Sequence, residues 1–156
     1  MKTKGLLFFL LVVICACSGT NEYEEFKTFK NQNWPLDSLA VFDFAVENID
    51  DSYRIDGYIR NTLDYPYYNI YMQYELLDEE GLILRSSLKE SDLMDAKTGK
   101  PLGSGSGSVF DVTFPLIESY KFDKEGNYQL KLRQYMRLDT LFGIQAVGFK
   151  LAKVQK

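Results

Sequence analysis

Polar and apolar side chains alternate one by one along much of the chain, and this period of two is the feature that most constrains its fold. Successive side chains of a β-strand point to opposite faces, so the alternation is typical of strands that bury one face. The segment from Tyr67 to Leu77 is the longest example, with Ile70 and Met72 on its expected inner face. Seven segments are predicted to be strands, at 41–47, 53–60, 67–77, 82–88, 110–114, 128–133 and 147–151.

Short acidic links join several of these segments and predict hairpins between them. Asp78–Gly81 and Asp123–Asn127 each contain a glycine, which provides the positive φ that tight turns require. Strands with one apolar face must bury that face against a second layer. We therefore predict an all-β fold in a single domain, residues 34–156: an antiparallel β-sandwich, immunoglobulin-like in general architecture, with about seven strands. A closed barrel is the alternative. A helical turn is expected within Gln134–Phe142, where the alternation stops.

The first residues have the three parts of an export signal. Two lysines precede the apolar run Gly5–Ile14, which is too short to span a bilayer, and the small residue Ala16 follows it. Cys17, directly after Ala16, looks like the lipidated cysteine of a bacterial lipoprotein, with cleavage before it. We predict a lipoprotein signal peptide in residues 1–16 and a lipidated N-terminal tether in residues 17–33, which binds the membrane through Cys17. The alternative is an ordinary signal peptide cut near Ala16, which would leave a free secreted protein.

The composition excludes several classes of function. The chain has no histidine, which is the common proton shuttle near neutral pH and a frequent metal ligand. Its net charge of −4 argues against nucleic-acid binding, because phosphates require a basic face. Once the leader is removed, Cys17 is the only cysteine left, so neither a thiol nucleophile nor a zinc cluster is available. The sequence therefore predicts no catalytic residue, no metal site and no cofactor.

Two polar patterns resemble chemical motifs but are better explained as turns. The segment 91–108, which ends in the Gly-Ser run 103–108, does not fit a phosphate loop around Gly99-Lys100, because Met94 and Pro101 stand where that motif needs a glycine and a serine or threonine. We predict a flexible or multi-turn connection there. The paired carboxylates at 50–51, 79–80 and 92/95 are neighbours in predicted turns, whereas a glycosidase needs two carboxylates that face one sugar from opposite sides. An enzyme that uses carboxylates alone is the weakest alternative.

A contact surface is predicted on the strand that begins near Tyr67. If Tyr68, Ile70 and Met72 face the core, the outward side carries mainly tyrosines. Tyrosine and arginine are favoured in protein–protein contacts, because they combine a large contact area with polar tips. The alternatives are that these tyrosines are ordinary strand formers, or that they stack on sugars. The predicted contact residues are Tyr65, Tyr67, Asn69, Tyr71 and Arg137.

A series of landmarks extends over nearly the whole chain after the leader. They are Cys17, Trp34, Ile59-Arg60-Asn61, Tyr65-Pro66-Tyr67-Tyr68-Asn69-Ile70-Tyr71, Leu102-Gly103-Ser104-Gly105, Phe110-Asp111, Gln134-Tyr135-Met136-Arg137, Leu141-Phe142-Gly143-Ile144 and Val147-Gly148. In this order they resemble the gliding motility-associated lipoprotein GldH family of Bacteroidetes. Each motif alone is weak, and the combination is fairly specific.

The resemblance implies an outer-membrane lipoprotein that is required for gliding over surfaces. It implies other Gld lipoproteins and the type IX secretion apparatus as partners, and it implies neither an enzyme activity nor a cofactor. The lipidation cysteine alone maps onto this chain, as Cys17. The resulting prediction is a non-catalytic, membrane-anchored lipoprotein that acts through protein–protein contacts. A glycan-binding surface lipoprotein is the alternative.

Overall fold

The computed structural model describes residues 23–154, so the predicted leader and Cys17 lie outside the described residues. Within this range no helix has the length and apolar character needed to cross a bilayer. The elements are β1 (Tyr23–Thr28), η1 (Lys30–Gln32), β2 (Asn33–Pro35), β3 (Ala40–Val46), β4 (Tyr53–Thr62), β5 (Asn69–Leu77), β6 (Ile83–Asp92), β7 (Ser104–Ser106), β8 (Val109–Tyr120), β9 (Gly126–Gln134), β10 (Thr140–Phe142) and β11 (Ile144–Lys153).

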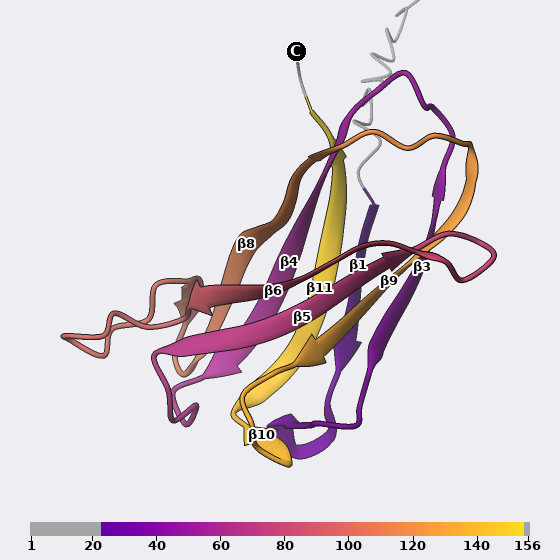
Figure 1. Ribbon diagram of the computed structural model, residues 1–156. Helices are drawn as coiled ribbons and strands as arrows, with labels where there is room; N and C mark the ends of the chain where they lie inside the picture. The colour runs from indigo at the N-terminus through magenta and orange to yellow at the C-terminus, as the bar shows by residue number, and fades with distance from the viewer. Residues whose placement is uncertain (1–22, 155–156) are drawn as a thin grey trace, which may run out of the picture.

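Two antiparallel sheets pack face to face, as the alternation predicts (Figure 1). The larger sheet has the order β1-β11-β4-β8-β7, the smaller sheet has the order β3-β9-β5-β6, and β2 pairs separately with β10. The prediction of an all-β antiparallel sandwich is confirmed, with more strands than the seven expected. The closed-barrel alternative is wrong, because the described strands form separate sheets.

The core lies between the sheets and is built from the inner faces of the strands. Burial alternates residue by residue along β3 and along most of β9, which is the pattern that the sequence predicts. The described residues contain no cysteine, so packing stabilises this part of the chain without a disulfide. The largest fully buried side chains include Trp34, Phe42, Tyr74, Phe122 and Phe149.

The segment expected to be a tether is folded from Tyr23 onward. β1 lies within the predicted tether 17–33 and pairs with β11 over six residues, from Tyr23 opposite Leu151 to Thr28 opposite Ala146. A single-turn 3-10 helix, η1, follows it. The part of the predicted tether that the structure describes therefore belongs to the sandwich. Residues 17–22 lie outside the described range.

β6 is an edge strand, and its leucines are not in the core. Leu82, Leu84 and Leu88 are predicted to share a buried face, and all three are exposed. Leu88 lies opposite Gln73 of β5, on the face that points away from the other sheet. Leu84 lies at the register shift between β5 and β6, and Leu82 precedes the strand. The inner side of β6 carries charges instead, because Arg85 and Lys89 lie opposite the core residues Leu76 and Met72 of β5. The prediction of a buried face on this segment is wrong.

The Gly-Ser segment is a short hairpin and not a flexible connection. Ser104–Ser106 form β7, which pairs with Val109–Asp111 of β8. A Cβ atom on Gly105 would lie 2.1 Å from the carbonyl oxygen of Val109, which is closer than any carbon can approach. Glycine is therefore required at this position by the approach of two backbones.

Replacing Gly105 by alanine is expected to open this hairpin without unfolding the sandwich. The new methyl group cannot coexist with the Val109 carbonyl, so β7 must move away from β8. We expect the free energy of unfolding to fall by about 1–2 kcal/mol, with faster amide hydrogen exchange at Ser104–Ser106. Ser104→Ala, at an exposed position of the same strand, is the control. Unchanged exchange in Gly105→Ala would contradict the prediction.

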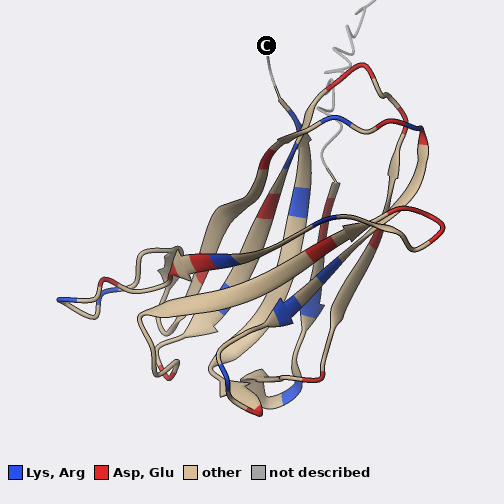
Figure 2. Cartoon of the chain, viewed as in Figure 1, with Lys and Arg blue, Asp and Glu red and all other residues tan. Residues whose placement is uncertain are grey.

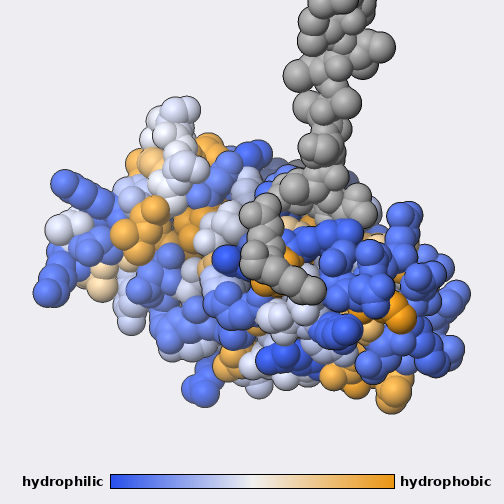
Figure 3. All heavy atoms as spheres, turned by 90° about the horizontal axis from the view of Figure 1, so that it is seen from above, coloured by the Kyte–Doolittle hydropathy of each residue, from blue (hydrophilic) through white to orange (hydrophobic). Residues whose placement is uncertain are grey.

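The two ends of the sandwich differ in character. At one end, which we call the N-terminal end, β1 begins beside the end of β11, and the β3–β4 and β8–β9 loops lie near them (Figure 1). These loops and the β5–β6 turn carry many carboxylates (Figure 2). Seen from this end, the described surface is mostly hydrophilic (Figure 3). The β4–β5 loop and the β9–β10 connection lie at the opposite end.

Candidate contact surface

The predicted contact residues of the β4–β5 loop divide into buried and exposed side chains. Tyr65 is 3% exposed and Asn69 is 8% exposed, so neither presents its side chain to solvent. Tyr67 and Tyr68 are exposed, Tyr68 at 49%. The hydroxyl of Tyr65 donates to the carbonyl oxygen of Asn69 at 2.7 Å, and burial raises the pKa of Tyr65. The outward placement expected for Tyr65 and the inward placement expected for Tyr68 are wrong, whereas Asn69 shares the outer face of β5 with Tyr71 and is buried there.

The start of β5 explains this difference. The strand begins at Asn69, so residues 63–68 form a loop and do not continue its alternation. Pro66 lies in this loop, where it lacks the backbone N–H that a strand would use. Ile70 and Met72 are buried as predicted, because they lie within the regular strand.

Glu90 of β6 joins two of the predicted residues. Asn69 donates a side-chain hydrogen bond to the Glu90 carboxylate, although the two residues lie on different strands. Tyr71 is directly opposite Glu90 in the strand register. A side-chain hydrogen bond with Glu90 raises the pKa of Tyr71. Asn69 is therefore a buried support for this corner of the sheet, and Tyr71 is half-buried beside it.

A bend after β9 brings further exposed side chains to the same place. The backbone N–H of Tyr135 donates to the carbonyl oxygen of Tyr71 at 2.8 Å, and the N–H of Tyr71 donates to the Met136 sulfur at 3.1 Å. Buried Gln134 fixes the bend, because its amide nitrogen donates to the Leu138 carbonyl oxygen and its amide oxygen accepts from the Met136 N–H, both at 2.8 Å. The helical turn expected within Gln134–Phe142 is wrong: this stretch is a bend followed by β10.

We call the resulting exposed surface the tyrosine end. It combines the β4–β5 loop, the start of β5 and the bend after β9, and it lies at the end of the sandwich opposite the N-terminal end. Sequence reasoning missed Tyr135, since only its hydrogen bond to β5 places it here. Its residues are Tyr67, Tyr68, Tyr71, Tyr135 and Arg137.

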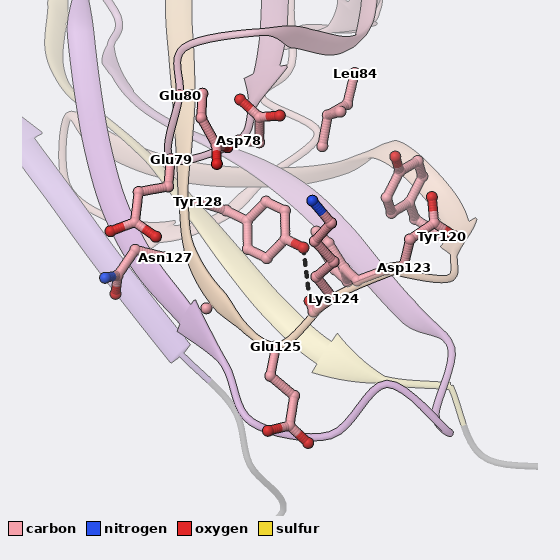
Figure 4. Close-up of a pocket in the computed structure, with 12 residues that line it drawn as sticks. Asp78, Glu79, Glu80, Leu84, Tyr120, Asp123, Lys124, Glu125, Asn127 and Tyr128 are labelled. Carbon is pink, nitrogen blue, oxygen red and sulfur yellow. Dashed lines mark hydrogen bonds between the residues drawn. The ribbon is translucent and has the colours of Figure 1, made fainter.

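The N-terminal end holds a cavity of about 240 Å³ between the β5–β6 and β8–β9 turns (Figure 4). The ring of Tyr128 lies at its centre, and the Tyr128 hydroxyl donates to the carbonyl oxygen of Lys124 at 2.6 Å. Within the described range, no group of acidic side chains is arranged to hold a metal ion. In Figure 4 the carboxylates are spread around the cavity, and Glu125 points away from it. The acidic residues that line it are Asp78, Glu79, Glu80, Asp123 and Glu125.

An ion pair lies on the outer face of the larger sheet. Arg60 of β4 donates two hydrogen bonds to Asp111 of β8, from Nε to Oδ1 at 2.7 Å and from Nη2 to Oδ2 at 2.8 Å. These bonds hold the pKa of Asp111 below its usual value of 3.8, and they outweigh the opposing effect of partial burial. The Arg60 guanidinium also lies 5.8 Å from the ring centre of Tyr58.

The Arg60–Asp111 pair is expected to stabilise the fold at neutral pH and to lose this effect in acid. Because folding lowers the pKa of Asp111, the contribution is complete above the pKa of the unfolded chain and disappears as the pH falls through the folded pKa. Asp111→Asn should lower the free energy of unfolding by about 0.5 kcal/mol at pH 7. The difference from the parent should vanish near pH 2, in denaturant titrations at several pH values. A difference that stays constant with pH would contradict the prediction.

Two curated relatives match nearly the whole chain. The gliding motility lipoprotein GldH homolog of Christiangramia forsetii is 29% identical over 157 residues, which cover 95% of this chain and 93% of the relative. The gliding motility lipoprotein GldH of Flavobacterium johnsoniae is 23% identical, over 97% of this chain and 96% of its own length.

Among solved structures, the VP2 subviral particle of infectious bursal disease virus is similar over 86% of this chain, at 12% identity and a TM-score of 0.38. The matched region is 33% of that viral chain, so this chain spans about a third of its length.

The GldH lipoprotein family is represented by a sequence model that matches residues 21–151. This range includes β1 and extends nearly to the end of β11, so it covers both sheets of the sandwich. The two relatives carry the same family name over nearly their full lengths. The chain therefore belongs to the GldH lipoprotein family, the gliding motility lipoproteins.

Proposed function

We propose that this chain is a non-catalytic lipoprotein of the gliding motility machinery, anchored in the outer membrane by acyl chains on Cys17. It acts through protein–protein contacts with other gliding or type IX secretion proteins, and the tyrosine end is the surface that makes these contacts. The observation that carries the proposal is the position of this surface. Exposed tyrosines of the β4–β5 loop and of the bend after β9 gather at the end of the sandwich opposite Tyr23, the residue at which β1 begins.

The length of the N-terminal segment supports this arrangement. Five residues separate Cys17 from the start of β1, and the six steps of extended chain from Cys17 to Tyr23 span at most about 22 Å. A lipid on Cys17 therefore keeps the N-terminal end close to the membrane. The tyrosine end then lies on the far side of the domain, where a partner can reach it.

The chemistry of the tyrosine end suits a protein partner. Tyr68 and Tyr135 are each 49% exposed, and Arg137 beside them is exposed. Tyrosine and arginine are over-represented among the residues that contribute most to binding. Tyr71 is held by backbone bonds on both its N–H and its carbonyl oxygen, so this part of the surface is ordered before a partner arrives.

The test replaces the gene with a Tyr68→Ala/Tyr135→Ala version, in the source bacterium or in a gliding relative that lacks its own copy. We expect at least about a tenfold loss of partner binding, which corresponds to 1.4 kcal/mol or more from two exposed anchors. Loss of spreading on surfaces should follow, with the amount of protein in the membrane fraction unchanged. Leu82→Ala/Leu88→Ala, which removes two exposed apolar side chains elsewhere, is the matched control.

A photo-crosslinking residue at position 68 or 135 should capture gliding or type IX secretion proteins in intact cells, whereas position 88 should not. Normal gliding and normal type IX secretion in a strain without the gene would overturn the proposal. Capture of glycans by the purified protein, abolished by Tyr67→Ala or Tyr71→Ala, would replace it with the glycan-binding alternative.

A further inference from the structure

The strand that connects the sandwich to its N-terminal segment is an edge strand with an unusual position. Among the described strands β1 pairs only with β11, and the two run antiparallel from Tyr23 opposite Leu151 to Thr28 opposite Ala146. The start of β1 therefore lies beside the last residues of β11, at the N-terminal end (Figure 1). The start of β11, at Ile144, pairs with Asn61 near the tyrosine end.

β1 buries little surface of its own, yet its side chains reach both sheets. Lys27 extends across the open side of the sandwich, and its Nζ donates to the carbonyl oxygen of Leu39 at 2.6 Å. The ring of Tyr23 lies 6.5 Å from that of Phe44 in β3 and 5.6 Å from that of Phe149 in β11. The first strand is therefore tied to the smaller sheet as well as to its neighbour in the larger one.

A third contact of β1 extends across β11 and reaches β4. The ring of Phe26 meets the ring of Tyr58 edge to face, with centres 4.5 Å apart, although β11 lies between the two strands. This is possible because Gly148 of β11 lies beneath Phe26, where a Cβ atom would be 2.4 Å from its Cδ1. The glycine thus allows Phe26 to pack on a strand that β1 does not pair with.

The force needed to separate β1 from β11 depends on the direction in which β1 is pulled. In antiparallel pairs the backbone hydrogen bonds are perpendicular to the strands. A force that draws Tyr23 away from the tyrosine end runs along β1 and shears all of these bonds together. A force that separates Tyr23 from the end of β11 acts on two neighbours at the same end, so it opens the bonds one after another.

We propose that β1 is a force-transmitting strand, through which the sandwich passes tension between its membrane anchor and a partner bound at the tyrosine end. This mechanical role rests on the proposed function, which sets the two points where force enters. The ring contacts of Tyr23 and Phe26 and the hydrogen bond of Lys27 distribute the force on β1 over β3, β4 and β11. The unfolding force is then large when the domain is pulled along the axis from anchor to partner, and small when it is pulled in other directions.

The test measures unfolding forces of single molecules pulled in two directions. The chain from Cys17 on, produced without its leader, carries one handle on the Cys17 thiol. The second handle is attached through Asp64→Cys, in the exposed β4–β5 loop, or through Val154→Cys, just after β11. At the same loading rate, we expect the unfolding force with the Asp64→Cys handle to be at least about twofold higher than with the Val154→Cys handle.

Variants of β1 distinguish the effect of its side-chain contacts on the unfolding force from the effect of the general stability of the sandwich. Phe26→Ala and Lys27→Ala should lower the force with the Asp64→Cys handle and leave the force with the Val154→Cys handle nearly unchanged. Lys121→Ala, an exposed lysine of the β8–β9 turn, is the control and should change neither. Denaturant titration of each variant verifies that it is folded.

Equal forces in the two directions would overturn the inference, as would release of β1 at low force in the Asp64→Cys version. These measurements need no partner, so a negative result leaves the proposed contact function standing. Conversely, a directional resistance in a protein whose loss does not affect gliding would contradict the proposed function alone.

Discussion

Cys17→Ser should move the protein from the membrane fraction to the soluble fraction and abolish its contribution to gliding. Each buried methylene of an acyl chain contributes about 0.8 kcal/mol, and stable anchoring requires more than one chain. The sequence has no cysteine after Cys17 that could replace it. The measurement is fractionation of cells grown with labelled palmitate, in which the label on the protein should disappear.

Cys15→Ser is the matched control for this experiment. Cys15 follows the bulky residue Ile14 and lies within the predicted leader, so its loss should leave both labelling and fractionation unchanged. Continued labelling of Cys17→Ser would contradict the prediction. Release of the unmodified parent into the medium would favour an ordinary signal peptide instead.

Trp34→Ala is expected to have the largest effect on stability of any single truncation in the core. Trp34 is fully buried, its ring is stacked on Phe29 with centres 5.2 Å apart, and its Nε1 donates to the Ser38 carbonyl oxygen at 2.8 Å. Truncation removes the packing and leaves that oxygen unpaired, at a cost of about 3–5 kcal/mol. Domains of this kind have a total stability of about 5–15 kcal/mol.

The expected result is a large shift of the urea midpoint with little change in slope, measured by circular dichroism because tryptophan fluorescence is lost. Leu36→Ala, two residues away and exposed, should change the free energy of unfolding by less than about 0.5 kcal/mol. A Trp34→Ala protein as stable as the Leu36→Ala protein would contradict this account of the core.

The alternating pattern predicts strands well where one face of the strand packs on the core. This holds for β5 and β9 and also for the edge strand β3, so their apolar side chains report directly on burial. The pattern fails for the edge strands β1 and β6. β1 has no fully buried residue and its sequence reads as a polar tail, because pairing with β11 and not burial holds it in the sheet.

β6 shows the opposite error. Its leucines suggest a buried face, but the register with β5 turns Leu88 to the outer face and Arg85 and Lys89 to the inner one, and residue spacing does not contain the register. The contact surface fails in part for a similar reason. The phase of the tyrosines before Asn69 depends on where β5 begins, and Tyr135 joins them through a backbone hydrogen bond between distant segments. The family motif Gln-x-Met-Arg marks this bend, although the motif alone does not show that Gln134 holds it from inside.

The charges on the inner side of β6 also bear on how densely such proteins can be crowded. A lipid anchor confines its carrier to two dimensions, where free sheet edges of neighbouring molecules meet far more often than in solution. Arg85 and Lys89 face inward on the open edge of the smaller sheet, and a strand added there would have to bury both. Inward-pointing charge is one of the devices by which edge strands avoid pairing with other chains. Arg85 and Lys89 therefore disfavour pairing between the β6 edges of neighbouring molecules.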